Sequence, residues 1–220
     1  MRVIKQHWEF EEPVDGQQIL KKIEKIGRVC YKTEDKINSE FAEAFVERIM
    51  KRGHLSVIEH QNISVRIVTD RGVTHEIVRH RLASYSQEST RYCNYSGERF
   101  GNELTIILPV WFYGIDLTQT TSELDFIEHQ YAVWYNTCIE LEKNYFKLLE
   151  LGQRPEGARS ILPNSLKTEI VMTCNLREWR HFFTLRSSKA AHPQMRELAS
   201  SMLAGFKNKI PIFFDDIKGD

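Results

Sequence analysis

Residues 79–92 carry the densest set of side chains able to do chemistry in this chain. They hold three arginines, one histidine, three serines, one threonine, one glutamine and one glutamate within fourteen positions. The planar guanidinium fork of arginine matches phosphate and carboxylate oxygens, and short hydroxyl groups complete a phosphate shell. The composition predicts an anion-binding segment able to hold a nucleotide. A solvated, charged helix end followed by a polar loop fits the same composition equally well.

Three arginines outside this stretch are further candidates for phosphate binding. The sequence has neither the G-x-x-x-x-G-K-[ST] nor the G-x-G-x-x-G motif, so side chains would have to hold any phosphates. Arg159 follows Gly157 in a short predicted helix, and Arg177 lies in the first turn after Asn175, where helix N–H groups favour anions. Arg186 stands among apolar neighbours. Taken singly, each arginine fits a surface salt bridge as well.

Metal and thiol chemistry are not indicated by the spacing of the cysteines and histidines. No C-x-x-C pair occurs, so neither a zinc cluster nor a redox dithiol is predicted, and we expect no metal. Cys93 and Ser89 lack an adjacent base in sequence. Two alternatives remain open from the residues alone. One is a nucleotide-binding regulatory module, and the other is a phosphodiesterase or RNase with His75 or His80 as its acid–base group.

The elements that must position these residues follow from hydrophobic periodicity. Helices are predicted at 15–26, 38–53, 73–83, 123–151, 155–161, 176–187 and 195–207, and strands at 1–8, 61–69, 103–109 and 167–175. Residues 79–92 would thus begin on a helix and end in a loop. We expect an α+β fold: a single catalytic domain over residues 1–220 with a central, mostly antiparallel sheet, flanking helices and a long helical segment.

Composition narrows the class of protein. The chain has 220 residues, of which 41% are hydrophobic, and its 30 basic residues balance its 30 acidic residues. Such a balance argues against a general nucleic-acid binder. Nothing at the N-terminus resembles a signal peptide, and no stretch approaches the roughly 20 apolar residues that span a bilayer. We therefore expect a cytoplasmic protein with reduced thiols and no membrane partner.

The order of residues around Ser89 resembles a family motif. Arg79-His80-Arg81, seven further residues and Ser89 resemble the R-H-R-x₇-S motif of the flavin-dependent thymidylate synthases, the ThyX family. Residues 27–30, 51–60, 158–163, 175–177 and 185–186 resemble that family's other motifs in order and spacing. Gln87, His181 and Cys30 stand where some members carry Glu, Asn and Ser. The resemblance extends from about residue 15 to residue 208.

The resemblance implies a reaction and its partners. Members methylate dUMP to dTMP with 5,10-methylenetetrahydrofolate as carbon donor, FAD as hydride carrier and NADPH as reductant. They form homotetramers whose active sites lie at subunit interfaces. Arg186 would be the catalytic residue, and His54 would lie on the folate side.

The resemblance also assigns the binding residues. The FAD site would comprise Ser56, Arg79, His80, Arg81, Gln87, Asn175, Arg177 and His181. The dUMP site would comprise Glu76, Arg79, Gln87, Glu88, Ser89, Thr90, Arg91, Arg159 and Arg186.

Elementary chemistry fits the role that the resemblance gives to Arg186. Uracil C5 is a poor nucleophile while N3 keeps its proton, and a guanidinium at the N3–O4 edge would stabilise the ring anion. Arginine stays charged even when partly buried. This route needs no cysteine adduct, which agrees with the lack of an activated cysteine in the sequence.

Overall fold

The computed structural model describes residues 1–37, 42–97, 100–115 and 126–219. The chain forms two compact units. Unit 1 comprises Met1–His7, Val68–His75 and Gln87–Ile170, and unit 2 comprises Trp8–Ile67, Glu76–Ser86 and Val171–Asp220. Strands β3 (Asn62–Asp70) and β6 (Lys167–Asn175) and helix α3 (Arg71–Ile77) each contribute residues to both units.

An antiparallel sheet has the strand order β2-β3-β6-β4, in which β2 spans His7–Phe10 and β4 spans Ala83–Gln87. Residues of β6 alternate between buried and half-buried positions, as expected for a strand with one face in the core. The β6 strand lies at the predicted residues, and β3 confirms the strand predicted at 61–69.

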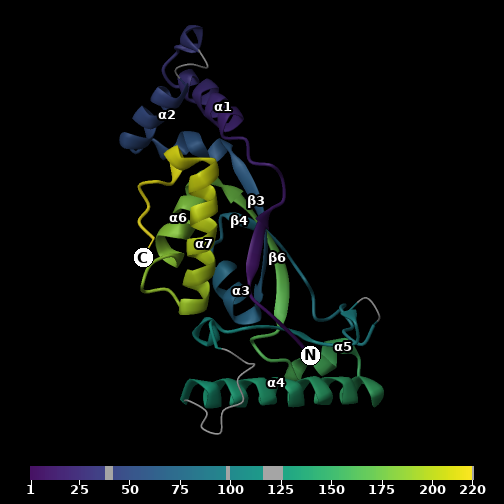
Figure 1. Cartoon of the computed structure of the whole chain (residues 1–220). Helices are drawn as coiled ribbons and strands as arrows, with labels where there is room; N and C mark the ends of the chain where they lie inside the picture. The colour runs from purple at the N-terminus through teal and green to yellow at the C-terminus, as the bar shows by residue number, and fades with distance from the viewer. Residues whose placement is uncertain (38–41, 98–99, 116–125, 220) are drawn as a thin grey trace. The chain divides into compact units, whose positions relative to one another are not determined.

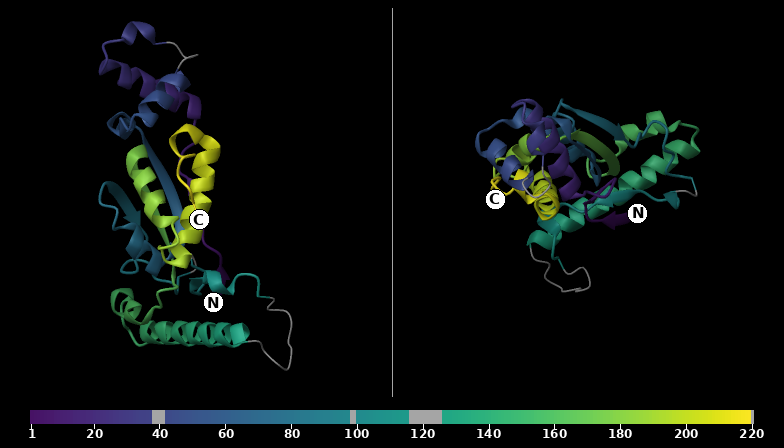
Figure 2. Two further views of the ribbon diagram at one scale, coloured as in Figure 1. Left: turned by 90° about the vertical axis from the view of Figure 1, so that its left-hand side faces the viewer. Right: turned by 90° about the horizontal axis from the view of Figure 1, so that it is seen from above.

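The helices that lie within unit 2 are α1 (Gly16–Val29), α2 (Ala42–Lys51), α6 (Leu176–Arg186) and α7 (Pro193–Lys209), with 3₁₀ turns η1 (Glu34–Lys36), η2 (Leu55–His60) and η6 (Pro211–Phe213). Helices α6 and α7 carry most of its aromatic core, and α1 and α2 pack against each other. Helices α6 and α7 run side by side (Figures 1 and 2). Trp179 of α6 stacks against Phe183, 5.7 Å between ring centroids, and its Nε1 donates to Ile63 O of β3 at 3.1 Å. This bond fixes α6 against the sheet.

Unit 1 is built around the long helix α4 (Phe126–Glu150), with the short helix α5 (Pro155–Ala158) and the 3₁₀ turns η4 (Val110–Phe112) and η5 (Arg159–Ile161). Strands β1 (Arg2–Ile4) and β5 (Thr105–Ile107) pair in parallel. Its core residues are Tyr95, Leu104, Ile106, Cys138, Tyr145, Ala158 and Leu166.

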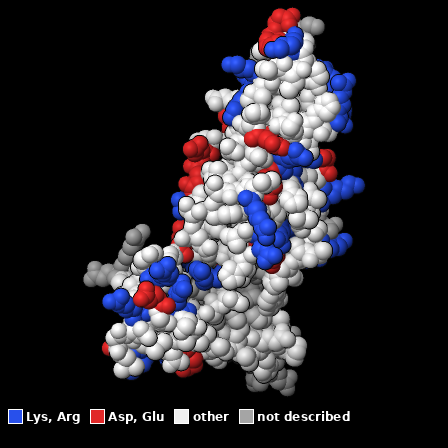
Figure 3. Space-filling view, turned by 180° about the vertical axis from the view of Figure 1, so that it is seen from behind, with Lys and Arg blue, Asp and Glu red and all other residues white. Residues whose placement is uncertain are grey.

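On the face of the chain drawn in Figure 3, basic and acidic side chains are interspersed.

The predicted helix at 73–83 is wrong in its second half. Helix α3 ends at Ile77, and β4 begins at Ala83. The Tyr85 hydroxyl donates to the carbonyls of Ile77 and His80, at 2.9 and 2.6 Å. These are carbonyls that a continuing helix would have used for its own ladder. Arg79, His80 and Arg81 therefore lie in a link between a helix and a strand.

Other boundaries differ in smaller ways. The strand predicted at 1–8 is two strands, β1 and β2, in different sheets. Helix α4 confirms the predicted long helix, although residues 123–125 at its predicted start lie outside the described residues, as do residues 38–41 at the predicted start of α2. The α+β class with a mostly antiparallel sheet is confirmed. No helix in the described part of the chain is long and apolar enough to cross a membrane.

Gly27 lies inside α1, where the sequence had suggested a helix end. A Cβ at this position would lie 2.7 Å from Cε1 of Phe45 and 3.2 Å from Cγ1 of Val57. The glycine therefore permits the close approach of α1 to α2 and η2, rather than ending the helix.

We expect Gly27→Ala to lower the free energy of unfolding by about 1 kcal/mol. Overpacking costs about 1–3 kcal/mol, and the gain in helix propensity of about 0.5–1 kcal/mol offsets part of it. Urea unfolding of this variant, of Phe45→Leu and of the double variant checks the cause. The double variant should lose less than the sum of the two single losses, and strict additivity would contradict the steric explanation.

Candidate active site

In unit 2, Arg186 and three other charged or titratable side chains form a connected group. The Arg186 Nε donates to His80 Nε2 at 3.1 Å, and its Nη1 donates to Glu76 Oε2 at 2.7 Å. Its Nη2 also donates to the Glu76 carbonyl at 3.1 Å. On the other side of the imidazole, His80 Nδ1 lies 3.2 Å from Glu178 Oε1. Arg186, His80 and Glu76 were all predicted site residues, and the structure brings them together.

Helix α6 explains how this group is positioned. Asn175 caps the helix, because its Oδ1 accepts from the amide of Glu178 at 2.9 Å. Glu178, Phe182 and Arg186 follow at spacings of four residues, so they share one face of α6. The Phe182 ring lies 4.9 Å from the His80 ring, between centroids. His80 therefore packs along the face that carries both of its hydrogen-bond partners.

Burial and charge hold His80 neutral. Burial, the guanidinium of Arg186 and the nearby His181 lower the pKa of His80 from 6.5 to about 4. A neutral imidazole has one donor and one acceptor nitrogen. Because the Nε–H of arginine can only donate, Nε2 of His80 must be the acceptor and Nδ1 must carry the proton.

Arg186 has donors to spare. Its guanidinium carries five N–H groups, of which three make the bonds above. The two remaining N–H groups have no acceptor among the described residues, and the side chain is 19% exposed. The guanidinium is thus fixed by one edge and able to donate to a ligand with the rest.

His80, Glu178 and His181 offer ligand atoms within 4.8 Å of one another, which is close enough for a metal ion. His80 uses both ring nitrogens in the bonds described, however, and one of them accepts from the cationic Arg186. A second cation would have to displace this guanidinium. The chemistry of the group favours an anionic or neutral ligand over a metal.

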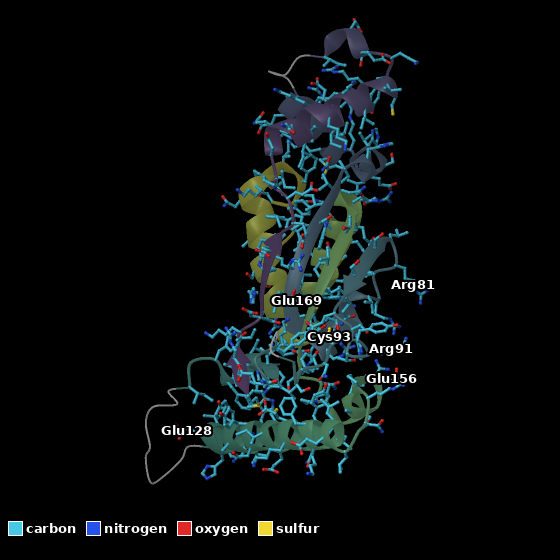
Figure 4. All side chains as sticks on the ribbon, turned by 90° about the vertical axis from the view of Figure 1, so that its right-hand side faces the viewer. Arg81, Arg91, Cys93, Glu128, Glu156 and Glu169 are labelled. Atoms are coloured by element: carbon cyan, nitrogen blue, oxygen red, sulfur yellow. The ribbon has the colours of Figure 1, made fainter. Side chains whose placement is uncertain are left out.

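The other predicted flavin-side residues of unit 2 take separate positions. Arg79 and Arg81 are exposed, and Arg81 points away from its unit (Figure 4). Neither forms an ion pair with any described residue. Arg177 pairs with Glu59 at 2.6 Å, and Ser56 is exposed in η2. His54 Nδ1 lies 2.9 Å from the Tyr31 hydroxyl. His181 is exposed, with its ring 5.6 Å from that of His80.

The exposed guanidiniums of Arg79 and Arg81 fit the phosphate groups of an anionic ligand. Two exposed guanidiniums two residues apart, without carboxylate partners among the described residues, form a donor set suited to phosphate oxygens. Arg79 and Arg81 would be the residues of this unit that hold such a group, while both ring nitrogens of the buried His80 between them are engaged by Glu178 and Arg186.

In unit 1, the remaining predicted residues make several separate sets of hydrogen bonds. Gln87 Nε2 donates to Thr74 Oγ1 at 3.0 Å and to Thr168 Oγ1 at 3.3 Å. Arg159 Nη1 donates to Thr90 Oγ1 at 3.3 Å. Ser89 Oγ accepts from the amide of Arg91 at 3.3 Å, and Arg91 projects outward (Figure 4). Gln87, Thr90 and Arg159 are thus held by side-chain hydrogen bonds within one unit, while the Ser89 hydroxyl contacts the backbone of Arg91.

Glu88 has internal partners for both of its carboxylate oxygens. The Tyr95 hydroxyl donates to Oε1 at 2.8 Å, and Lys167 Nζ donates to Oε2 at 2.9 Å. Lys167 also donates to Glu169 Oε1 at 2.5 Å. Burial disfavours the charged form of Lys167, but the hydrogen bonds to Glu169 and Glu88 raise its pKa overall. Glu88, Tyr95 and Lys167 border a pocket of about 280 Å³.

Sequence reasoning missed Glu178, Lys167 and Tyr95. The pattern Asn175-x-x-Glu178 resembles a capping box, so a signal existed, but it would have assigned Glu178 to the cap rather than to His80.

A larger pocket of about 660 Å³ in unit 2, between the start of α1 and β3, is lined by none of the predicted site residues.

Comparison with known proteins gives the class of this chain. Residues 15–212 match the family described as thymidylate synthase complementing protein. Because this match covers most of the sequence, the chain belongs to that family.

Named relatives are similar along almost the whole chain. The flavin-dependent thymidylate synthase of Corynebacterium aurimucosum is 33% identical over 217 residues, which cover 95% of this chain and 83% of that protein. The one of Mycobacterium tuberculosis is 33% identical over 211 residues, covering 93% and 81%. A solved structure, the UMP/dUMP methylase PolB from Streptomyces cacaoi bound with 5-Br dUMP, has a TM-score of 0.76 at 21% identity and covers 98% of this chain and 96% of that one. This last likeness shows the fold.

The neutral state of His80 gives a pH prediction. A histidine whose pKa falls on folding binds its proton more weakly in the native state, so stability should fall as the pH drops from 6.5 towards 4. The loss should reach roughly 3 kcal/mol below that range. An NMR titration should find His80 neutral at pH 6, and His80→Asn should lose less stability on acidification. A His80 that titrates near 6.5 would contradict the prediction.

The ion pair in unit 1 gives a second prediction. Lys167→Met should lower the free energy of unfolding by about 1–3 kcal/mol, because it removes the cation and the donor to Oε2 of the largely buried Glu88 carboxylate and leaves only the Tyr95 hydroxyl on Oε1. Adding Glu88→Gln should recover part of the loss. The control Lys143→Met breaks an exposed pair with Glu140 on α4 and should cost less than about 1 kcal/mol. Equal losses in the two lysine variants would contradict the assignment.

Proposed function

We propose that this chain is a flavin-dependent thymidylate synthase, which methylates dUMP to dTMP. Family membership and relatives of that name over most of the chain support this reaction. We also propose 5,10-methylenetetrahydrofolate as the carbon donor, FAD as the cofactor and NADPH as the reductant. The chain would act as one catalytic domain over residues 1–220, within a cytoplasmic homotetramer whose active sites lie at subunit interfaces.

The observation that carries the proposal is the state of Arg186. It is a charged group fixed on one edge by His80 and Glu76, with two N–H donors left for a ligand. Placed against the N3–O4 edge of uracil, these donors would stabilise negative charge on the ring and raise electron density at C5. Because Glu76 and His80 already hold the guanidinium, little reorganisation is needed when that charge develops.

Other residues would bind rather than react. Arg79, His80, Arg81, Arg177 and the cap at Asn175, with Ser56 and His181, would hold FAD, and a flavin bound there would supply the hydride chemistry. In unit 1, Arg159 and Arg91 with the hydroxyls of Ser89 and Thr90 suit a nucleotide phosphate. Gln87 and Glu88 would complete that site, and Lys167 would offset the charge of Glu88 near an anionic substrate. His54 would lie towards the folate.

The direct test is formation of dTMP from dUMP by the purified protein with 5,10-methylenetetrahydrofolate, FAD and NADPH. We expect turnover and a flavin absorption band. Protein that takes up no FAD and forms no dTMP would refute the proposal. A regulatory module would bind dUMP without turnover, and an RNase would cleave RNA without flavin.

Arg186→Lys should lower kcat by roughly 100-fold, while dUMP binding should weaken much less. Loss of one preorganised donor at a developing charge costs on the order of 10²–10³ in rate, and lysine lacks the planar fork. Arg48→Lys, on the exposed face of α2, is the matched control and should keep the full rate. A rate near that of the wild type in Arg186→Lys would reject the role of this guanidinium.

A further inference from the structure

A carboxylate is buried behind the imidazole that supports Arg186. Glu178 is only 6% exposed and His80 only 4%. The order of contacts is linear: Glu178 Oε1 to His80 Nδ1 at 3.2 Å, then His80 Nε2 to Arg186 Nε at 3.1 Å. Glu178 thus reaches Arg186 only through His80.

We propose that Glu178 is a positioning residue that fixes the Nδ1–H form of His80 and thereby sets the direction of the Arg186 guanidinium. The proposal rests on the proposed function for its effect on rate, but the contact itself can be tested without turnover. It assigns Glu178 a role that acts through His80, since its carboxylate is buried and contacts that imidazole.

The hydrogen-bond chemistry allows one arrangement. An Arg186 Nε–H can only donate, so the lone pair of His80 Nε2 must face it. The single proton of the neutral ring then lies on Nδ1 and needs an acceptor, which the Glu178 carboxylate provides. Without that acceptor, no hydrogen bond stabilises the Nδ1–H form of the ring. A proton on Nε2 would point at the Arg186 Nε–H and push the guanidinium away.

Energetics argue that Glu178 is not there for packing. Burial raises its pKa, which means that the site disfavours its charged form. A leucine of similar size would avoid the cost of burying a carboxylate. The helix cap does not need this side chain either, because Asn175 accepts from the Glu178 amide and not from its carboxylate. The charged group is explained by the imidazole that it contacts.

The surroundings of His80 limit what else could set its proton. The titratable and charged groups that face it are Glu178, Arg186 and His181, while Phe182 packs against its ring and the Tyr85 hydroxyl donates to its carbonyl. Among these, Glu178 alone is placed to accept from Nδ1.

The test compares Glu178→Leu with Glu178→Gln. The leucine removes the acceptor at similar size, while the glutamine keeps an oxygen that can accept from Nδ1. As a control, Glu47→Leu changes an exposed carboxylate on α2 that pairs with Lys51. The first measurement is ¹⁵N NMR of the histidine rings in protein free of flavin and dUMP, which identifies the protonated nitrogen of His80. The second is kcat and KM for dUMP.

We expect the wild type, Glu178→Gln and Glu47→Leu to hold His80 as the Nδ1–H form. Glu178→Leu should shift His80 towards the Nε2–H form and lower kcat by roughly 10–100-fold, because a misplaced catalytic group costs about that much. KM for dUMP should change much less, since Arg186 would still be present to bind. Glu178→Gln should rescue most of kcat.

Each failure has its own signature. A wild-type His80 in the Nε2–H form overturns the proposal without any variant, even if Glu178→Leu does not fold. The same tautomer and the same kcat in Glu178→Leu and the wild type overturn it too. A Glu178→Gln as slow as Glu178→Leu, with His80 still as Nδ1–H, would overturn the link from tautomer to rate. Absence of dTMP formation by the wild type would instead refute the proposed function, while the NMR result would still decide the contact.

Discussion

The bond between Arg186 Nε and His80 Nε2 is the interaction on which the site in unit 2 depends. A guanidinium stays charged and its N–H groups can only donate, so a histidine beside it must stay neutral to accept a hydrogen bond from it. Burial keeps His80 neutral, and the same burial would leave its other nitrogen unsatisfied if no acceptor were present. Glu178 supplies that acceptor. The charge of Arg186 therefore sets the protonation of His80, and the protonated Nδ1 of His80 in turn needs an acceptor at the position of Glu178.

One helix and one short link position the three residues of this chain of contacts. Glu178, Phe182 and Arg186 lie on one face of α6, and Trp179 fixes the helix to β3 by its bond to Ile63. The link between α3 and β4 delivers His80 to that face, and the Tyr85 hydroxyl holds the link by two carbonyls. Helix α6 thus positions both Glu178 and Arg186, while the short link between α3 and β4 places His80 between them.

Local patterns predicted much of this and missed its non-local part. The β6 strand and α6 follow from β-formers and the Asn175 cap, which act within a few residues. The prediction of a helix at 73–83 was wrong after Ile77, where the Tyr85 hydroxyl donates to the carbonyls of Ile77 and His80. Hydrophobic periodicity does not encode such a contact. The family motif identified Arg186 and His80. Glu178 and Lys167 were missed because their contacts span 98 and 79 residues of sequence. Such distances are fixed by the sheet and not by spacing.

The two buried thiols, Cys138 and Cys174, are poorly suited to nucleophilic catalysis. Burial, with the nearby Glu178, raises the pKa of Cys174, and burial raises that of Cys138. A nucleophilic cysteine needs the opposite environment, one that stabilises the thiolate. The carboxylate that suits His80 and Arg186 is therefore the wrong neighbour for a reactive thiol. In unit 2, the buried carboxylate that supports His80 therefore also disfavours a thiolate at Cys174, which agrees with the role proposed for the Arg186 guanidinium.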